Sequence, residues 1–441
     1  MDFSGSLAHS AKLAAGHRQA FSPSLTLGWK LSNESFLKDS ESVDDLTLSV
    51  SGSIVNQDID IADYYLYAPI WKTDNYGYEW NDGNLSQYVT STRGQNDLLT
   101  FIQRKEVSAN IKGAFFNNSL TFDASYFIQS MEGYLIDNTT TWPSHMATSY
   151  PDQSFIPWLN YNNNARTGFD VSVNYNKTWG DFTLGAGVNA TWYDTIASRR
   201  DEVYTDHRQR EGKPLDGIWG YQSAGLFQSQ EEIDNRINDE GLHVNQNGAQ
   251  PGDVAYKDVN NDGEITGDDR TILGSGMSKV QFGLSFRLEY KGFDLNVSTY
   301  GAAGYQVMDF IDRTLRGSYG ATNKSVDLVN AWTPENPSTT VPRVYWASTG
   351  SITNDMFSSR FLQNGAYWKI ANVELGYNLP DKWFKDVISG VRVYVSGQNL
   401  ATISKYRGYN IDFAGGTFTP GYNYCSYPTP MTLMLGVNLS F

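Results

Sequence analysis

The feature that most limits what this chain can fold into is a strict alternation of apolar and polar residues over 280–298. Apolar side chains take every second position on both sides of Lys291-Gly292: Val280, Phe282, Leu284, Phe286, Leu288 and Tyr290 before it, then Phe293, Leu295 and Val297. A period of two is typical of a strand with one apolar face, so two such runs joined by two turn residues predict an antiparallel hairpin. Arg287 and Glu289 indicate that the second face meets water.

The same alternation recurs along the whole chain. Runs with one apolar face and one face of small or polar residues occupy 3–8, 24–31, 46–54, 107–115, 120–128, 169–175, 182–192, 280–290, 293–298, 372–379, 391–395 and 431–441. Helical periodicity is nearly absent, and the only short candidate is SQEEIDNR at 229–236. The sequence therefore predicts an all-β protein of about twelve strands.

The connections between these strands alternate in length. Short ones lie at Asn117-Asn118, 179–181, Lys291-Gly292 and 381–390, and long ones run over 56–104, 131–166, 195–279, 304–365 and 402–430. This pattern is typical of an antiparallel transmembrane β-barrel with short periplasmic turns and long extracellular loops. Lipid offers no hydrogen bonds to the backbone, so such a sheet must close or be sealed by more chain. A secreted β-sandwich or propeller is the alternative.

Composition sets further limits. The net charge of −15 argues against a nucleic-acid partner, and the single cysteine, Cys425, excludes an intrachain disulfide framework. No run approaches the ~18–20 apolar residues of a membrane-spanning helix. The first residues lack the pattern of a signal peptide, whereas Phe441, at the end of an alternating strand, resembles the terminal signal read during outer-membrane insertion.

A carboxylate-rich loop, DVNNDGEITGDD, lies within 251–270, at the end of the long 195–279 segment. The predicted Ca²⁺ ligands are Asp258, Asn260, Asp262, the backbone carbonyl of Glu264, Thr266 (directly or through water) and Asp269. Gly263 stands where a calcium loop bends sharply. Position 12 carries Asp, as in a dockerin-type loop, but only one such loop is present. The alternative is an Asx-rich turn without metal.

The long loops also carry aromatic clusters, which are candidates for substrate recognition. The predicted substrate-binding residues are Trp71, Tyr76, Tyr78, Trp80, Trp142, Trp158 and Tyr161. Aromatic faces can stack on sugar rings or peptide side chains. The alternative is that they form a girdle at the membrane interface or pack the loops. Five scattered histidines and the absence of a nucleophile elbow give no catalytic constellation, so we expect no enzyme.

Several segments together resemble a known family. FSPSLTLGWKLSNESFLKD (21–39), EGKPLDGIWGYQSAGLFQS (211–229), PGDVAYKDVNNDGEITGDDR (251–270), YKGFDLNV (290–297) and GVNLSF (436–441) occur in family order. The chain resembles the C-terminal half of a SusC/RagA-type TonB-dependent outer-membrane transporter. The resemblance implies an importer of glycan or peptide fragments in the outer membrane. It also implies a SusD-like surface lipoprotein as its cap and energy from the TonB complex.

The chain departs from that pattern because no plug domain, TonB box or first barrel strands can be identified. The resemblance therefore implies that 1–441 are the C-terminal part of a receptor barrel, and that TonB acts only through the missing N-terminal part. A fragment, a mis-called start and a split gene all fit this expectation. Two other functions stay open: a passive outer-membrane pore or adhesion barrel, and a secreted calcium-stabilised β protein that binds a partner.

Overall fold

The computed structural model describes residues 1–58, 60–61, 63–74, 79–80, 84–85, 88–137, 156–201, 209–317, 323–345, 352–380, 383, 389–413 and 420–441. Within these ranges, no helix combines the length and apolar character needed to cross a membrane.

The main element is a single antiparallel sheet whose strands follow one another in chain order. Its twelve strands are β1 (Asp2–His9), β2 (Gln19–Lys30), β3 (Val43–Gln57), β8 (Ile102–Phe115), β9 (Leu120–Ile136), β10 (Leu159–Trp179), β11 (Phe182–Arg199), β16 (Val280–Tyr290), β17 (Phe293–Ala303), β20 (Tyr367–Asn378), β21 (Gly390–Ser404) and β23 (Thr432–Ser440). Each strand pairs with the next, so β1 and β23 end the order and the described sheet is open.

The remaining elements are short and lie in the long connections. The small strands are β4 (Ile70–Asp74), β5 (Glu79–Trp80), β6 (Asn84–Leu85), β7 (Tyr88–Arg93), β12 (Gly217–Gly220), β13 (Ser223–Leu226), β14 (Val254–Tyr256), β15 (Thr271–Ser275), β18 (Gln306–Asp309), β19 (Leu362–Asn364) and β22 (Tyr422–Asn423). The helices are α1 (Gln230–Asp234) and α2 (Phe310–Arg316), with 3-10 turns at Ala15–His17, Leu31–Asn33, Gly267–Asp269, Val326–Asn330 and Ser359–Phe361.

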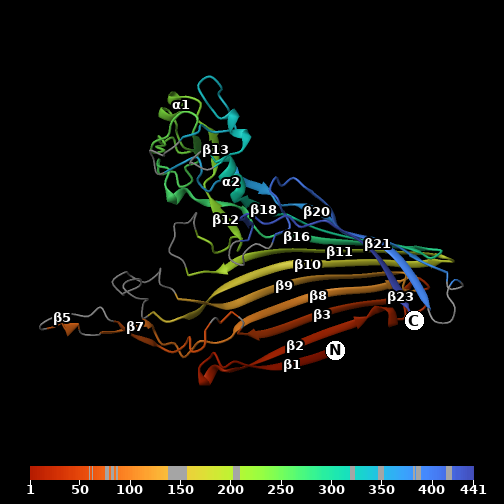
Figure 1. Ribbon diagram of the computed structural model, residues 1–441. Helices are drawn as coiled ribbons and strands as arrows, with labels where there is room; N and C mark the ends of the chain where they lie inside the picture. Colours follow the sequence, from red (N-terminus) through yellow and green to blue (C-terminus); the bar gives the residue numbers. More distant parts are fainter. Residues whose placement is uncertain are drawn as a thin grey trace. The chain divides into compact units, whose positions relative to one another are not determined.

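The chain divides into two compact units. Unit 1 comprises Met1–Ser172, Tyr193–Thr205 and Gln209–Leu215, and unit 2 comprises Val173–Trp192, Asp206–Arg208 and Asp216–Phe441. In unit 1, β1, β2, β3, β8 and β9 run side by side (Figure 1). Its buried core, in the loops, consists of Leu13, Ile61, Leu66, Leu99 and Phe101.

Strand register in unit 1 separates two kinds of row across the sheet. One row runs Leu27, Val50, Ala109 and Tyr126, one residue from each of β2, β3, β8 and β9. The adjacent row, on the opposite face, runs Gly28, Ser49, Asn110 and Ser125. Because side chains alternate across a strand, one face is apolar and the other is small and polar.

Unit 2 carries a longer apolar row. It runs Leu184, Leu288, Leu295, Leu375, Val395 and Leu435, one residue from each of six consecutive strands. Leu375 is 47% exposed and Leu435 80% exposed. Leu433 and Val437 on the same face of β23 are exposed as well, so no second layer of described residues packs against this part of the face. A contiguous apolar surface of this extent is characteristic of contact with a membrane or a partner.

The opposite face of unit 2 holds ion pairs. Arg392 in β21 donates to Asp294 in β17 and to Glu374 in β20. Asp294 is buried, and its two oxygens take the two guanidinium nitrogens. A bidentate pair between a buried carboxylate and an arginine fixes the relative position of three strands. This face is therefore polar and internally connected.

The two connections 216–279 and 305–361 pack together within unit 2. Figure 1 shows α1, β13 and α2 gathered beyond one end of the strands of unit 2. Tyr221, Val254 and Tyr256 belong to a buried cluster of this region, and Arg343 forms a two-contact ion pair with Asp253. The long loops of this unit therefore have a core of their own.

The strand predictions are confirmed, since each of the twelve alternating runs lies within or overlaps a strand of the main sheet. The turn at Lys291-Gly292 has positive φ at both residues, 49° and 89°, as a two-residue hairpin turn requires. The predicted helix at 229–236 contains α1, whereas α2 was not predicted. Several strands extend further than the alternation does, for example β10, which begins at Leu159 rather than 169.

Candidate functional site

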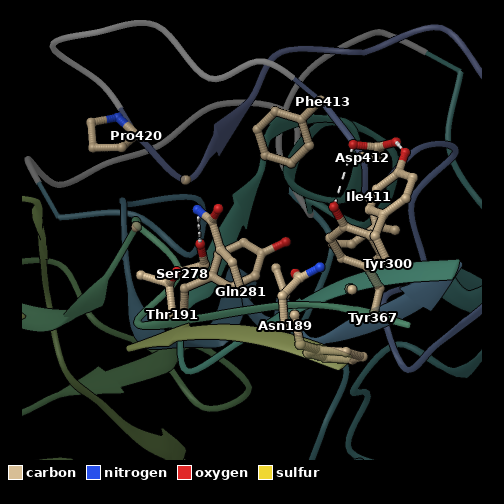
Figure 2. A pocket seen from close by; sticks show the side chains of 17 residues that line it. Asn189, Thr191, Ser278, Gln281, Tyr300, Tyr367, Ile411, Asp412, Phe413 and Pro420 are labelled. Carbon is tan, nitrogen blue, oxygen red and sulfur yellow. Dashed lines mark hydrogen bonds between the residues drawn. The ribbon is translucent and has the colours of Figure 1, made fainter. Parts of the chain in front are cut away.

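A cavity of about 670 Å³ lies in unit 2, at the strand ends that are remote from the Lys291-Gly292 turn (Figure 2). Residues from β11, β16, β17 and β20 line it, together with Ile411, Asp412 and Phe413 from the segment that follows β21. We call residues 405–413 the returning segment, because it folds back over the strands. The volume falls within the ~300–1,000 Å³ that is usual for ligand sites.

Strand register explains which side chains face the cavity. Asn189 pairs with Gly283, Gly283 with Tyr300, and Tyr300 with Lys369, so one row of the polar face crosses four strands. A side chain at Gly283 would place its Cβ 2.8 Å from the Asn189 Oδ1 atom. The glycine therefore leaves the space that the Asn189 amide needs.

Asp412 fastens the returning segment to the strands. Its Oδ2 atom accepts hydrogen bonds from the Tyr300 hydroxyl at 2.5 Å and from the Lys369 Nζ at 2.9 Å. Its Oδ1 atom accepts a longer one, 3.4 Å, from the Tyr367 hydroxyl. Lys369 is only 3% exposed. Such an anchor joins a loop residue to β17 and β20 through one carboxylate.

The ionisation of this site follows from its contacts. Burial disfavours the charged form of Asp412, but the hydrogen bonds from Tyr300 and Lys369 outweigh it and hold the pKa of the carboxyl below its usual value. Burial raises the pKa of the Tyr305 hydroxyl, and the neighbouring Tyr367 and Asp412 raise it further. At neutral pH the carboxylate is therefore ionised and paired with an ammonium group, and Tyr305 is neutral.

The other side of the cavity is polar but uncharged. Gln281 donates to the Ser278 hydroxyl at 3.1 Å, and Thr191 lies beside them (Figure 2). Gly276 and Gly421 close this side, because a Cβ on Gly276 would lie 2.0 Å from the Pro420 carbonyl oxygen. Gly421 has a φ of 78°, which a side chain disfavours. The two glycines let the backbone at Pro420 lie directly against the 276 turn.

The aromatic residues predicted to bind substrate lie elsewhere, and the described ones do not line this cavity. Trp71 is 66% exposed on β4, and Trp158 packs against the unit 1 core. The ring centre of Tyr161 on β10 lies 3.9 Å from the guanidinium carbon of Arg199. Trp80 belongs to β5. Tyr76, Tyr78 and Trp142 lie outside the described residues. Their role in recognition stays a prediction.

The predicted calcium loop is closed by hydrogen bonds of its own. Asp258 Oδ2 accepts from the Gly263 amide, and both carboxylate oxygens of Asp269 accept backbone amides, from Val259 and Thr266. Asn260 and Asp262 are joined by side-chain bonds typical of Asx turns. Among the described residues, no group of three or more acidic, histidine or cysteine side chains has a metal-site geometry.

One atom of this loop lacks a partner. Asp258 is 3% exposed, and its Oδ1 atom is buried without a hydrogen bond among the described residues. Burial, together with the charge of Asp258, raises the pKa of the Asp269 carboxyl, although bonds from Thr266 and Val259 oppose this. A buried carboxylate oxygen without a partner is costly, and a cation is one group that can satisfy it. The donor set, all hard oxygens, fits Ca²⁺.

The comparisons with known proteins concern the whole chain. No family model matches it. It is 28% identical to TonB-dependent receptor P3 of Formosa agariphila, over 98% of this chain and 43% of that protein. It is 24% identical to TonB-dependent receptor SusC of Bacteroides thetaiotaomicron, over 98% of this chain and 41% of that protein.

The fold comparison agrees. The RagAB peptide transporter matches 100% of this chain and 45% of its own, with a TM-score of 0.78 and 20% identity, which shows a shared fold. The chain spans about two fifths of the length of the curated relatives it matches. Those relatives are receptors and not enzymes.

Proposed function

Because the chain is a homologue of SusC-type TonB-dependent receptors, which are outer-membrane β-barrel proteins, we propose that it supplies barrel wall and outer loops to an energised importer of glycan or peptide fragments. The observation that carries this proposal is the aliphatic row from Leu184 to Leu435, which is exposed at Leu375, Val395 and Leu435 and partly exposed at its other members. It crosses six consecutive strands of an antiparallel meander. Outer-membrane lipid would cover that row, as lipid covers the apolar band of other barrels.

Partners follow from the same relationship. A SusD-like surface lipoprotein would cap the long loops, whose own buried cluster, around Val254 and Tyr256, gives it a stable surface. The TonB complex would act through the part of such receptors that this chain does not match. The polar face, with the ion pairs of Arg392, would line the lumen.

The function is tested by disrupting the gene in its host and measuring uptake of labelled oligosaccharide and peptide pools. We expect the protein in the outer-membrane fraction, and we expect loss of uptake of at least one pool on disruption. Uptake should also stop when a protonophore removes the energy that TonB uses. Uptake that persists with protonophore would indicate a passive pore, and a detergent-independent protein would indicate the secreted alternative.

We also propose that the 258–269 loop binds one Ca²⁺ through Asp258, Asn260, Asp262, Thr266, Asp269 and the backbone carbonyl of Glu264. The buried, unpartnered Oδ1 of Asp258 supports this proposal. The cation would offset the repulsion between buried carboxylates and hold an outer loop in one conformation.

We expect replacement of Asp258 and Asp262 by Asn to weaken Ca²⁺ binding at least tenfold, because the amide oxygens remain as possible ligands but two negative charges are lost. Calorimetry with Ca²⁺ alone measures this, and protease cleavage within 251–270, with and without chelator, reports loop order. Asp239→Asn serves as the control, since Asp239 is exposed and pairs with Lys257 outside the loop. Equal cleavage with and without chelator in the unaltered protein would contradict the proposed Ca²⁺ site.

A further inference from the structure

We infer that the cavity beneath the returning segment binds an uncharged, polyhydroxylated ring, that is, one unit of a neutral glycan. This inference rests on the proposed import function and narrows its substrate class. Three observations carry it: the balance of charge, the placement of aromatic and amide side chains, and the position at the long-loop end of the polar face.

Charge balance comes first. Of the described residues that line the cavity, Asp412 alone carries a charge. That charge is paired with the Lys369 ammonium at 2.9 Å and receives two tyrosine hydroxyls. A ligand carboxylate or ammonium group would therefore lose its water without gaining an opposite charge. The cavity consequently disfavours acidic sugars and zwitterionic peptides.

The side chains also divide into two kinds by position. Figure 2 shows Gln281, Ser278 and Thr191 on one side, and Tyr300 and Tyr367 on the other, with Phe413 facing the strands from the returning segment. Amide and hydroxyl groups can donate to and accept from ring hydroxyls, each of which does both. An aromatic face covers the C–H surface of a sugar ring. A neutral saccharide presents both surfaces.

The position of the cavity gives it a role in import. It opens on the polar face, at the ends of β16 and β17 that connect to the long loops. Under the proposed function a fragment would meet this site on entering the lumen from outside. Asn189 stands at the β11 end of the row that crosses the floor, and Phe413 lies above it (Figure 2).

The test measures binding by calorimetry to the protein purified from outer membranes in detergent. The probes are neutral hexaoses (maltohexaose, cellohexaose, laminarihexaose, xylohexaose and mannohexaose), trigalacturonate and trialanine. We expect at least one neutral hexaose to bind and both charged probes to bind at least tenfold more weakly. Asn189→Ala and Phe413→Ala should each weaken that binding about tenfold, through a lost hydrogen bond and a lost stacking face.

Asn110→Ala is the matched control, because Asn110 lies on the polar face of β8 in unit 1 and does not line the cavity. Gln281→Glu keeps the side-chain volume but adds a charge, and it should also weaken binding of the neutral hexaose. Heat-modifiable electrophoretic mobility verifies that each variant is folded. The inference is overturned if trialanine or trigalacturonate binds more tightly than every hexaose, if no hexaose binds, or if the cavity variants match Asn110→Ala. A protein that imports peptides but binds no hexaose would keep the proposed function and lose this inference.

Discussion

Replacing Val50 by arginine should destabilise the membrane-inserted barrel by about 2–4 kcal/mol, the cost of a cation on the lipid-facing side near the middle of the bilayer. Val50 is 53% exposed and stands in the apolar row with Leu27, Ala109 and Tyr126. An arginine there has no opposite charge to meet in that row. At 1.4 kcal/mol per tenfold, the ratio of folded to unfolded protein should fall by roughly two orders of magnitude.

Ser49→Arg is the adjacent control on the same strand. Its row contains Gly28, Asn110 and Ser125, so the side chain would enter the polar face and reach water. We expect a change below about 1 kcal/mol for this variant. Urea titration in lipid vesicles, followed by heat-modifiable mobility, measures both. Equal losses in the two variants would mean that the faces are not divided between lipid and lumen.

The strands could be predicted because their signal is local. In β16 and β17 each side chain is placed by its immediate neighbours along the chain, and the turn at Lys291-Gly292 sets the register. The alternation fades at the long-loop ends, as in the YNNNAR stretch at the start of β10, where both faces carry polar residues. Strand limits there depend on contacts that no short window contains.

The cavity could not be predicted for the same physical reason. Asp412 is one acid among 48 Asp and Glu, and its partner Tyr300 lies 112 residues earlier in the chain. Phe413 and Pro420 also line the cavity, and they come from the connection after β21, where the sequence has no regular alternation. The one available signal is the polar face itself: Asn189 and Gln281 fall on the phase that alternation assigns to the lumen.

The loop candidates illustrate a different limit. Aromatic clusters in the long loops predict Trp71, Trp158 and Tyr161 as substrate-binding residues, but composition does not distinguish an aromatic ring that stacks on a ligand from one that packs within its own loop. Trp158 is partly buried against Leu99 and its neighbours, and Trp71 is exposed. For the 258–269 loop, the spacing of oxygen side chains predicts a Ca²⁺ site, yet the same residues form Asx-turn hydrogen bonds. Sequence spacing alone therefore cannot distinguish a ligand-binding residue from one that stabilises its own loop.

Removing the Asp412 charge should release the returning segment. In Asp412→Asn the buried Lys369 keeps its charge and loses its carboxylate, which costs about 3–5 kcal/mol when both partners are buried. Asp412 is about one third exposed, so we expect about 3 kcal/mol. Local opening of 405–413 should become about a hundredfold more frequent, which hydrogen-exchange mass spectrometry of that peptide measures. Asp123→Asn is the control, because its pair with Lys112 is exposed and should contribute no more than about 1 kcal/mol.

A second substitution separates the anchor from simple packing. Adding Lys369→Met to Asp412→Asn removes the unpaired ammonium, so most of the lost protection should return, since replacing both charges of a buried pair by uncharged groups costs little. The segment would still be held by the buried contacts of Tyr406 and Ile411 with Val307. If the double variant opens as often as Asp412→Asn alone, the hydroxyl and carboxylate bonds hold the segment, and the Lys369 charge has no part in it. If it recovers, the opening of Asp412→Asn comes from the unpaired Lys369 charge, and the buried contacts of Tyr406 and Ile411 are enough to keep the returning segment over the floor of the cavity.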